Sequence, residues 1–270
     1  MPTMIDLKGR TALVTGASSG IGEQFARQLA ARGMNLVITA RRTDKLEALA
    51  ADLRHNNKVD VEVIALDLGQ PSAALELFDK TEGAGKRVDV LVNNAGFGTQ
   101  EHFVDIPWEK TLEQIQLNVV SLTELTYRFS KRMLPRGGGW ILNVASVGAY
   151  MPVPDYATYG AGKAYVRNFT EALAFELRRT PVRVCCLCPG PTATEWMQVA
   201  GQKETPIIRM VQMSAARCAR IGLGALFAGR RNIIAGVMNS IGMWLLRFVP
   251  RRLMVRLAGI FMEKPPATST

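Results

Sequence analysis

The sequence predicts a doubly wound α/β fold, with a parallel sheet of about seven strands covered by helices on both faces. Short apolar runs alternate with longer segments that have helical periodicity, and each short run is almost continuously hydrophobic. Continuous hydrophobicity is typical of strands with two buried faces, because side chains pointing in either direction leave water. With 270 residues, of which 48% are hydrophobic, the chain can bury a large core as one domain.

The predicted elements follow one another as strand and helix along most of the chain. The strands are Thr11–Thr15, Asn35–Ala40, Val61–Leu66, Val88–Asn93, Trp140–Ala145, Val182–Cys188 and, as a seventh, Asn232–Ala235. The helices are Gly22–Ala31, Asp44–Arg54, Ser72–Thr81, Trp108–Leu134 and Asp155–Arg178. We expect a catalytic domain over residues 1–236 and an extension over 237–270 that packs on or near it, with ligands at the carboxyl ends of the strands.

A glycine-rich turn joins the first strand to the first helix. Gly16 allows a tight turn, Gly20 lets the backbone approach a pyrophosphate, and Gly22 permits close packing of helix on strand. The N-terminus of the helix also offers unpaired N–H groups to an anion. The strand–turn–helix context therefore predicts dinucleotide binding, as in a Rossmann fold. The expected contacts in this turn are Gly16, Ser18, Ser19, Gly20, Ile21 and Gly22.

The end of the second strand indicates which dinucleotide binds. An NAD-specific site usually carries an acidic residue there, whereas this chain has Arg41 and Arg42. An arginine can hold a 2′-phosphate through bidentate, charge-assisted hydrogen bonds, so the sequence favours NADP(H). The alternative is that both arginines are ordinary surface charge. Asp67, after the third strand, can accept a hydrogen bond from the adenine amino group, and its neighbour Leu68 is placed in the same site.

Four further residues predict the chemistry. Tyr159 and Lys163 are four residues apart on a predicted helix, so their side chains share a face. A free tyrosine has a pKa of about 10, and lowering it by about three units requires roughly 4 kcal/mol of phenolate stabilisation. A lysine ammonium and an oxidised nicotinamide are both cationic and can supply it. Ser146 can hydrogen-bond a substrate oxygen, and Asn118 can anchor a water that connects Lys163 to solvent.

Together these motifs resemble the short-chain dehydrogenase/reductase family in order and spacing, over about residues 7–195. The matching set is Thr15-Gly16-x-x-x-Gly20-Ile21-Gly22, Asn93-Asn94-Ala95-Gly96, Asn118, Ser146, Tyr159-x-x-x-Lys163 and Pro189-Gly190.

The resemblance implies a role for each matching residue. Tyr159 would exchange a proton with the substrate oxygen, which Ser146 would orient and polarise. Lys163 would lower the pKa of the tyrosine and bind the nicotinamide ribose, and Asn118 would support a proton relay. Tyr156 lacks the four-residue offset to the lysine and is interpreted as pocket lining or packing. The further cofactor contacts implied are Asn93, Ala95, Gly96, Pro189, Gly190, Pro191 and Thr192.

The sequence departs from the family pattern at its C-terminal end. Many members finish soon after the seventh strand with a Gly-Gly segment that helps to build a tetramer, whereas here an apolar, arginine-bearing segment spans Val237–Met262. Pro250 predicts a kink or break in it. The longest uncharged stretch, Asn232–Leu246, is too short and too polar for a transmembrane helix. Three interpretations stay open: a lid on the substrate pocket, a dimer surface, and an interfacial membrane anchor.

The charge distribution and the cysteines indicate which binding partners are expected. The formal net charge is +10, and residues 201–270 hold 11 Lys and Arg against Glu204 and Glu263, which gives +9. The arginines alternate with apolar residues, so no nucleic-acid partner is expected. Three of the four cysteines lie within Val182–Cys188 and are predicted to be reduced core thiols, with no metal site. The N-terminus lacks the apolar core of a signal peptide, so we expect a cytoplasmic protein.

The sequence as a whole predicts an NADP(H)-dependent carbonyl reductase or secondary alcohol dehydrogenase, assembled as a homodimer or homotetramer. An apolar ketone is the expected substrate, either a fatty 3-oxoacyl thioester or a steroid-like or xenobiotic ketone, because Pro152, Val153, Trp196 and Met197 fall near the predicted pocket. Two alternatives belong to other classes. One is an NADP(H) sensor or scaffold without turnover, and the other is a protein that binds membranes or polyanions through the basic tail.

Overall fold

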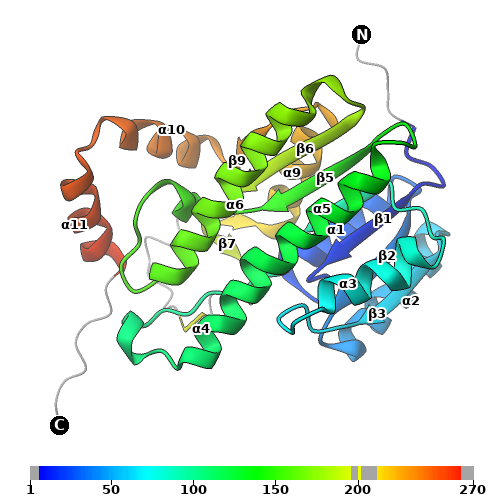
Figure 1. Cartoon of the computed structure of the whole chain (residues 1–270), viewed down its shortest axis with the longest axis horizontal. Coiled ribbons are helices and arrows are strands. Elements are labelled where there is room, and N and C mark those ends of the chain that lie inside the picture. The colour runs from blue at the N-terminus through cyan, green and yellow to red at the C-terminus, as the bar shows by residue number, and fades with distance from the viewer. Residues whose placement is uncertain (1–5, 196–199, 202–211, 263–270) are drawn as a thin grey trace.

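The computed structural model describes residues 6–195, 200–201 and 212–262, and it confirms the doubly wound α/β fold. Seven parallel strands form the main sheet in the order β3-β2-β1-β4-β5-β6-β9 (Figure 1). Each predicted strand is present, with ends displaced by one or two residues at most. The strands are β1 (Thr11–Thr15), β2 (Asn35–Ala40), β3 (Val61–Ala65), β4 (Val90–Asn93), β5 (Gly139–Val144), β6 (Val182–Cys188) and β9 (Asn232–Ile234).

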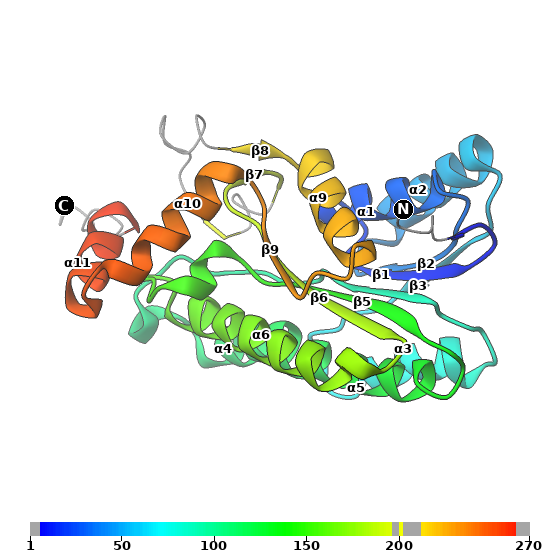
Figure 2. The ribbon, with the colours of Figure 1, turned by 90° about the horizontal axis from the view of Figure 1, so that it is seen from above.

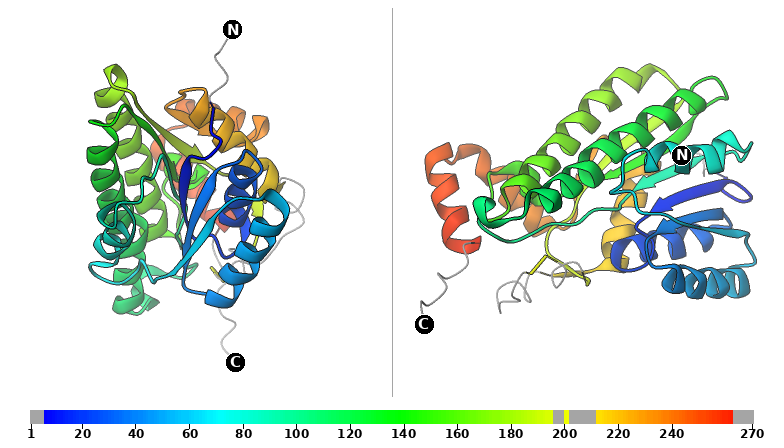
Figure 3. Two further views of the ribbon diagram at one scale, coloured as in Figure 1. Left: turned by 90° about the vertical axis from the view of Figure 1, so that its right-hand side faces the viewer. Right: turned by 60° about the horizontal axis from the view of Figure 1, so that its bottom comes forward.

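Helices cover both faces of the sheet, so the described chain has three layers (Figure 2). One face carries α1 (Gly20–Ala30), α2 (Thr43–Asn57) and α9 (Ala215–Phe227). The other carries α3 (Ala73–Phe78), α4 (Trp108–Ile115), α5 (Leu122–Met133) and α6 (Ala157–Glu176). The view from the side in Figure 3 shows the same separation of the two helical layers by the sheet.

Neighbouring residues of each central strand enter different cores, which explains the continuous hydrophobicity. Val14 packs in the core under α1 and α9 with Phe25 and Leu223. Leu13, the adjacent residue, packs in the core under α3 and α5 with Phe129. All five side chains are fully buried. An alternating pattern would leave one of these two layers without an apolar partner.

Three helical segments differ from the prediction. The helix predicted over Ser72–Thr81 is α3 followed by a π-helical turn, Asp79–Gly83. The sequence analysis did not anticipate α9, whose buried face includes Gly222; a Cβ there would lie 2.8 Å from Leu187 Cδ2, so a small residue lets the helix approach β6 closely. The segment predicted as one helix over Trp108–Leu134 is α4 and α5 joined by a π-helical turn, Gln116–Ser121, which contains Asn118. Such wide turns are frequent at functional sites, because they re-aim the side chains they carry.

A buried polar network ties β4 and β5 to the helices beside them. Asn93 Nδ2 donates to Asn143 Oδ1 at 2.9 Å and to Thr126 Oγ1 at 3.0 Å, and Asn143 Nδ2 donates to Thr170 Oγ1 at 3.1 Å. The four side chains are at most 2% exposed. A buried amide that loses its partners retains its desolvation cost, so this network constrains how β4, β5, α5 and α6 fit together.

The chain leaves the sheet for a small second element and then a C-terminal helical pair. β7 (Thr192–Ala193) and β8 (Met213–Ser214) form a two-stranded parallel sheet. After β9, α10 (Val237–Leu245), a 3₁₀ turn (Leu246–Phe248) and α11 (Arg251–Met262) lie at one end of the molecule (Figures 1 and 2). Pro250 precedes α11 and confirms the predicted break. Among the described helices, none is both long and apolar enough to cross a bilayer.

The buried network predicts a stability effect. Asn143→Ala removes the hydrogen bonds that Asn143 makes with Asn93 and Thr170, while Asn93 keeps its bond to Thr126 and Thr170 keeps its bond to Val166 O, so the free energy of unfolding should fall by about 1–3 kcal/mol in all. Asn168→Ala, at an exposed position of α6, is the control and should change it by less than about 0.5 kcal/mol. Urea unfolding measures both. An equal effect of the two substitutions would contradict the role of the network.

Candidate active site

One large pocket opens at the carboxyl ends of the strands, with a volume of about 550 Å³. Its wall includes most of the residues that the sequence predicts for the cofactor and the chemistry. They are Gly16, Ser18, Ser19, Gly20, Ile21, Arg41, Arg42, Asp67, Leu68, Ala95, Gly96, Ser146, Tyr159, Lys163, Pro189, Gly190, Pro191 and Thr192. Gly22, Asn93 and Asn118 are not part of this wall.

The glycine-rich turn has the geometry that close approach of a ligand requires. Gly16 and Gly20 have φ angles of +67° and +61°, in the left-handed region that side chains disfavour. Gly22 does not touch the pocket; a Cβ there would overlap the carbonyl oxygen of Gly16, so its hydrogen permits α1 to pack against the turn. The predicted roles of Gly16 in a tight turn and of Gly22 in close helix packing agree with this geometry.

Asn94 and Thr15 hold this turn in place, and the sequence analysis assigned them no role. Asn94 Nδ2 donates to Thr15 O at 3.0 Å and to Gly16 O at 3.3 Å. The Thr15 hydroxyl in turn accepts from the backbone N–H groups of Asn94 and Ala95, both at 3.0 Å. Asn93 was predicted to line the cofactor path, but its side chain belongs to the buried network between the strands. Successive residues of a strand point to opposite sides, so Asn93 stabilises the buried network while Asn94 holds the glycine-rich turn.

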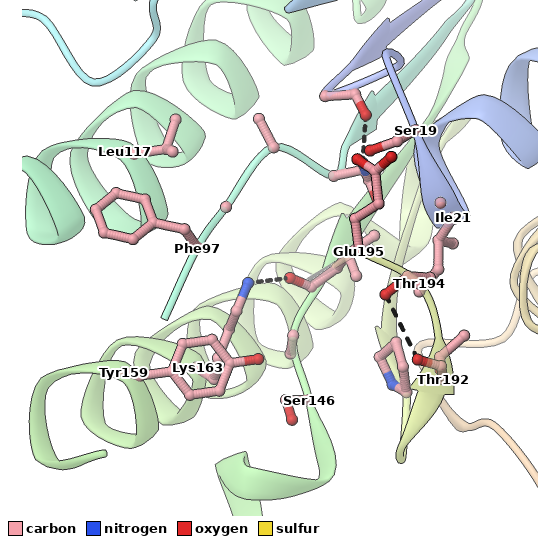
Figure 4. Close-up of a pocket in the computed structure, with 18 of the residues that line it drawn as sticks. Ser19, Ile21, Phe97, Leu117, Ser146, Tyr159, Lys163, Thr192, Thr194 and Glu195 are labelled. Atoms are coloured by element: carbon pink, nitrogen blue, oxygen red, sulfur yellow. Dashed lines mark hydrogen bonds between the residues drawn. The ribbon is translucent and has the colours of Figure 1, made fainter. Parts of the chain in front are cut away.

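Arg42 lies over the glycine-rich turn. Its guanidinium donates to Ser19 Oγ at 2.8 Å, to Ser18 Oγ at 3.2 Å and 3.3 Å, and to Glu195 Oε2 at 2.8 Å. The Arg42 hydrogen bond lowers the pKa of the exposed Glu195 carboxyl, which therefore stays ionised at neutral pH. Figure 4 shows Glu195 and Ser19 on the same side of the pocket. Because β2 and the segment after β6 are far apart in sequence, the spacing of residues did not reveal Glu195 as a partner.

Arg41 has a different set of neighbours. Its Nη1 lies 3.2 Å from Glu113 Oε1 and 3.9 Å from Asp67 Oδ2. Asp67 also accepts from the backbone N–H of Gly69 at 2.9 Å, which orders the loop after β3. The two adjacent arginines are therefore paired with different carboxylates, and Arg42 is the one that contacts the serines of the glycine-rich turn.

Tyr159 and Ser146 meet at the other end of the pocket. Ser146 follows β5 and begins a 3₁₀ turn, where its Oγ accepts from the backbone N–H of Gly148 at 3.1 Å. The Ser146 hydroxyl is also hydrogen-bonded to Tyr159. Burial raises the pKa of Tyr159 to about 12, and this hydrogen bond offsets the rise only in part. The expected lowering of the tyrosine pKa is therefore not produced by the protein groups alone.

Lys163 lies one helical turn after the tyrosine on α6. Its Nζ donates to Val144 O, at the end of β5, at 2.9 Å, and lies 5.7 Å from the centre of the Tyr159 ring (Figure 4). Burial lowers the pKa of Lys163 to about 8, because the apolar surroundings disfavour the ammonium. At neutral pH the side chain still carries its charge, next to the phenol that would exchange a proton.

Asn118 lies behind the pocket wall. Its Nδ2 donates to Phe97 O at 2.8 Å, and its Oδ1 accepts from Phe97 N at 3.2 Å. The position of a Cβ on Gly96 would be 2.8 Å from Asn118 Oδ1 and 3.4 Å from Lys163 Nζ. Both polar groups therefore converge on one glycine, and the Asn118 amide holds the segment after β4 that carries Phe97 into the pocket.

The wall near Tyr159 is mostly apolar. The residues that line this part of the wall are Phe97, Leu117, Met151, Val153 and Tyr156. Tyr156 therefore serves as pocket lining, which is one of the two roles predicted for it. Figure 4 shows Phe97 and Leu117 on the side of the pocket opposite Ser146. Of the other residues expected there, Pro152 is not part of the wall, and Trp196 and Met197 lie outside the described residues.

Comparisons with known proteins place the chain in a family. The family model described as short chain dehydrogenase matches residues 10–205. A 7β-hydroxysteroid dehydrogenase of Collinsella aerofaciens is 30% identical over 235 residues, covering 86% of this chain and 88% of that protein. A very-long-chain 3-oxoacyl-CoA reductase of Phaeosphaeria nodorum is 35% identical over 187 residues, covering 67% of this chain but 54% of that protein.

A solved structure agrees over nearly the whole length. It is a short-chain dehydrogenase from Sphingobium yanoikuyae in complex with NADPH, with a TM-score of 0.80 and 30% sequence identity. The match covers 97% of this chain and 98% of that chain. Fold, site and comparisons lead to one conclusion: this chain belongs to the short-chain dehydrogenase/reductase family of oxidoreductases.

Proposed function

We propose that this protein is an NADP(H)-dependent carbonyl reductase, or secondary alcohol dehydrogenase, that acts on an apolar ketone. The observation that carries the proposal is one continuous pocket with two chemically different ends. Arg42 lies over the glycine-rich turn at one end, and the hydroxyls of Tyr159 and Ser146 meet beside Lys163 at the other. A nicotinamide dinucleotide would match these two ends, because its phosphates lie in one part of the molecule and its reactive nicotinamide ring lies in another.

The choice of NADP(H) rests on the groups around Arg42. Its guanidinium and the hydroxyls of Ser18 and Ser19 form a cluster of hydrogen-bond donors at the end of β2, where a 2′-phosphate would be held. Glu195 competes for the same guanidinium. Binding of the phosphate therefore requires the carboxylate to move away or to share the arginine. Asp67 would accept a hydrogen bond from the adenine amino group.

The protein groups supply a proton and orient the substrate. The bound cofactor would provide or accept the hydride. For reduction, Tyr159 would give its proton to the carbonyl oxygen, and Ser146 would donate a hydrogen bond to the same oxygen. Lys163, charged at neutral pH, would stabilise the phenolate that remains. The pKa of about 12 in the protein alone keeps Tyr159 protonated and ready to act as an acid.

The apolar wall supports a substrate with little charge near its carbonyl. Phe97, Met151 and Val153 offer dispersion contacts and no ionised group. A steroid-like ketone and a fatty 3-oxoacyl thioester both fit this chemistry, and the two sequence relatives named above act on molecules of these kinds according to their names. We further expect the protein to act in the cytoplasm as a homodimer or homotetramer.

Substitution of the tyrosine tests the reaction. Tyr159→Phe removes the proton donor, so kcat for ketone reduction should fall by about 10²- to 10⁴-fold, while the Kd for NADPH stays the same. Tyr165→Phe, on the same helix with its hydroxyl 3.1 Å from Thr123 Oγ1, is the matched control and should keep full activity. Consumption of NADPH with a panel of apolar ketones measures the rate. NADPH binding without turnover on any ketone would favour a sensor or scaffold instead.

Two substitutions with opposite effects test the cofactor assignment. Arg42→Ala should raise the Kd for NADPH by roughly ten- to a hundredfold, because hydrogen bonds to a charged group are worth about 1.5–3 kcal/mol. Glu195→Gln should lower it, because the competing carboxylate is neutralised. The Kd for NADH serves as the internal control and should change little in either variant. Equal changes for both cofactors in fluorescence titrations would contradict the assignment.

A further inference from the structure

The exposed face of α10 is apolar, and the polar side chains of Asn239 and Ser240 lie on its partly buried side. Ser240 Oγ donates to Ile234 O of β9 at 3.3 Å, and a Cβ on Gly190 would overlap the Asn239 amide, so these two side chains lie toward the body of the protein. A surface helix normally has the reverse arrangement. The exposed apolar residues, at helical spacing and between 48% and 78% exposed, are Val237, Met238, Ile241, Trp244, Leu245 and Phe248.

The same surface continues over α11 and gains positive charge. Leu253, Val255, Leu257 and Ile260 are exposed apolar residues of this helix. Residues 213–262 contain no Asp or Glu, and Glu263 is the only acidic residue between positions 205 and 270, so the arginines outnumber the carboxylates in this part of the sequence. The exposed arginines on the turn and on α11 are Arg247, Arg251, Arg252 and Arg256. We call these four arginines and the exposed apolar residues of α10 and α11 the C-terminal surface.

We propose that the C-terminal surface docks on an anionic lipid bilayer and lies in its interfacial layer. Apolar side chains of one helix face can enter the acyl boundary, and Trp244 suits the headgroup level. Arginines can keep their guanidinium groups among lipid phosphates while their stems cover apolar surface. Since none of the described helices can cross a bilayer, the contact would be peripheral.

Charge complementarity favours a bilayer over a second copy of the chain. In a two-fold dimer the patch would face itself, so the four arginines of each copy would approach those of the other. Residues 213–262 offer no carboxylate to separate them. An anionic leaflet instead supplies the opposite charge over the whole surface, and it attracts basic segments that lie within a Debye length.

The surface lies next to the substrate end of the pocket. A Cβ on Gly190, which lines the pocket, would overlap Asn239 of α10. On α11, the position of a Cβ on Gly259 is 3.7 Å from Pro154 Cγ, one residue after the pocket residue Val153. Docking would therefore bring the apolar end of the pocket close to the membrane. The proposal concerns the surface alone and does not depend on the reaction.

Vesicle flotation of the full chain tests the proposal. We expect binding to vesicles of phosphatidylcholine with phosphatidylserine, and much weaker binding to phosphatidylcholine alone or at high salt. The double substitution Arg251→Gln with Arg252→Gln should weaken partitioning by roughly fivefold for each arginine. Phe248→Ser should weaken it by roughly tenfold. Fluorescence of Trp244 should shift to shorter wavelength on binding, and Trp244→Ser should abolish that shift.

Matched controls lie at the far end of α6. Arg178→Gln with Arg179→Gln removes another adjacent arginine pair, and Phe175→Ser removes another exposed phenylalanine, 51% exposed against 69% for Phe248. Both should bind vesicles as the unmodified chain does, and thermal unfolding verifies that each variant is folded. The proposal is overturned by equal binding to both kinds of vesicle, by equal losses in the controls, or by no binding. It is also overturned if Phe248→Ser separates an oligomer while leaving vesicle binding unchanged.

Discussion

The parallel pairing of β1 with both β2 and β4 is the constraint on which the rest of the structure depends. Thr15 at the end of β1 is flanked by Thr39 of β2 on one side, while Val14 is paired with Val92 of β4 on the other. The chain turns away from β1 in opposite directions on its two sides, so a crevice opens where those strands end. The pocket lies at this edge of the sheet, and Ser18, Ser19, Ser146, Tyr159 and Lys163 line it.

Two kinds of support keep the crevice in shape. On the β4 side, Asn94 and Thr15 hold the glycine-rich turn through four hydrogen bonds. Beneath the chemical end, the buried network of Asn93 and Asn143 sets the spacing between β4, β5 and α6. Lys163 then spans from α6 to the last carbonyl of β5. Because these contacts belong to the protein alone, the site is organised before any ligand arrives.

Sequence reasoning predicted the fold and most of the pocket wall for a physical reason. Parallel strands with two buried faces have a continuous apolar pattern, and the residues just after them converge at one edge. Partners distant in sequence were missed, because spacing contains no information about them: Glu195 beside Arg42 is the main example. The burial of the Asn93 side chain was not predicted, because a pattern of four residues does not say which of two adjacent amides faces the core. The pKa of Tyr159 is raised in the protein alone and not lowered, because burial disfavours the phenolate and the extent of burial depends on tertiary packing.

The transfer of deuterium from NADPH labelled at carbon 4 of the nicotinamide tests the central claim most directly. The protein would be incubated with the labelled cofactor and an apolar ketone, and the alcohol formed would be analysed by mass spectrometry and NMR. The account predicts one deuterium on the carbinol carbon, and it predicts that the labelled alcohol forms about 10²- to 10⁴-fold more slowly when Tyr159 is replaced by phenylalanine. Tight binding of NADPH with no labelled alcohol from any apolar ketone would contradict it.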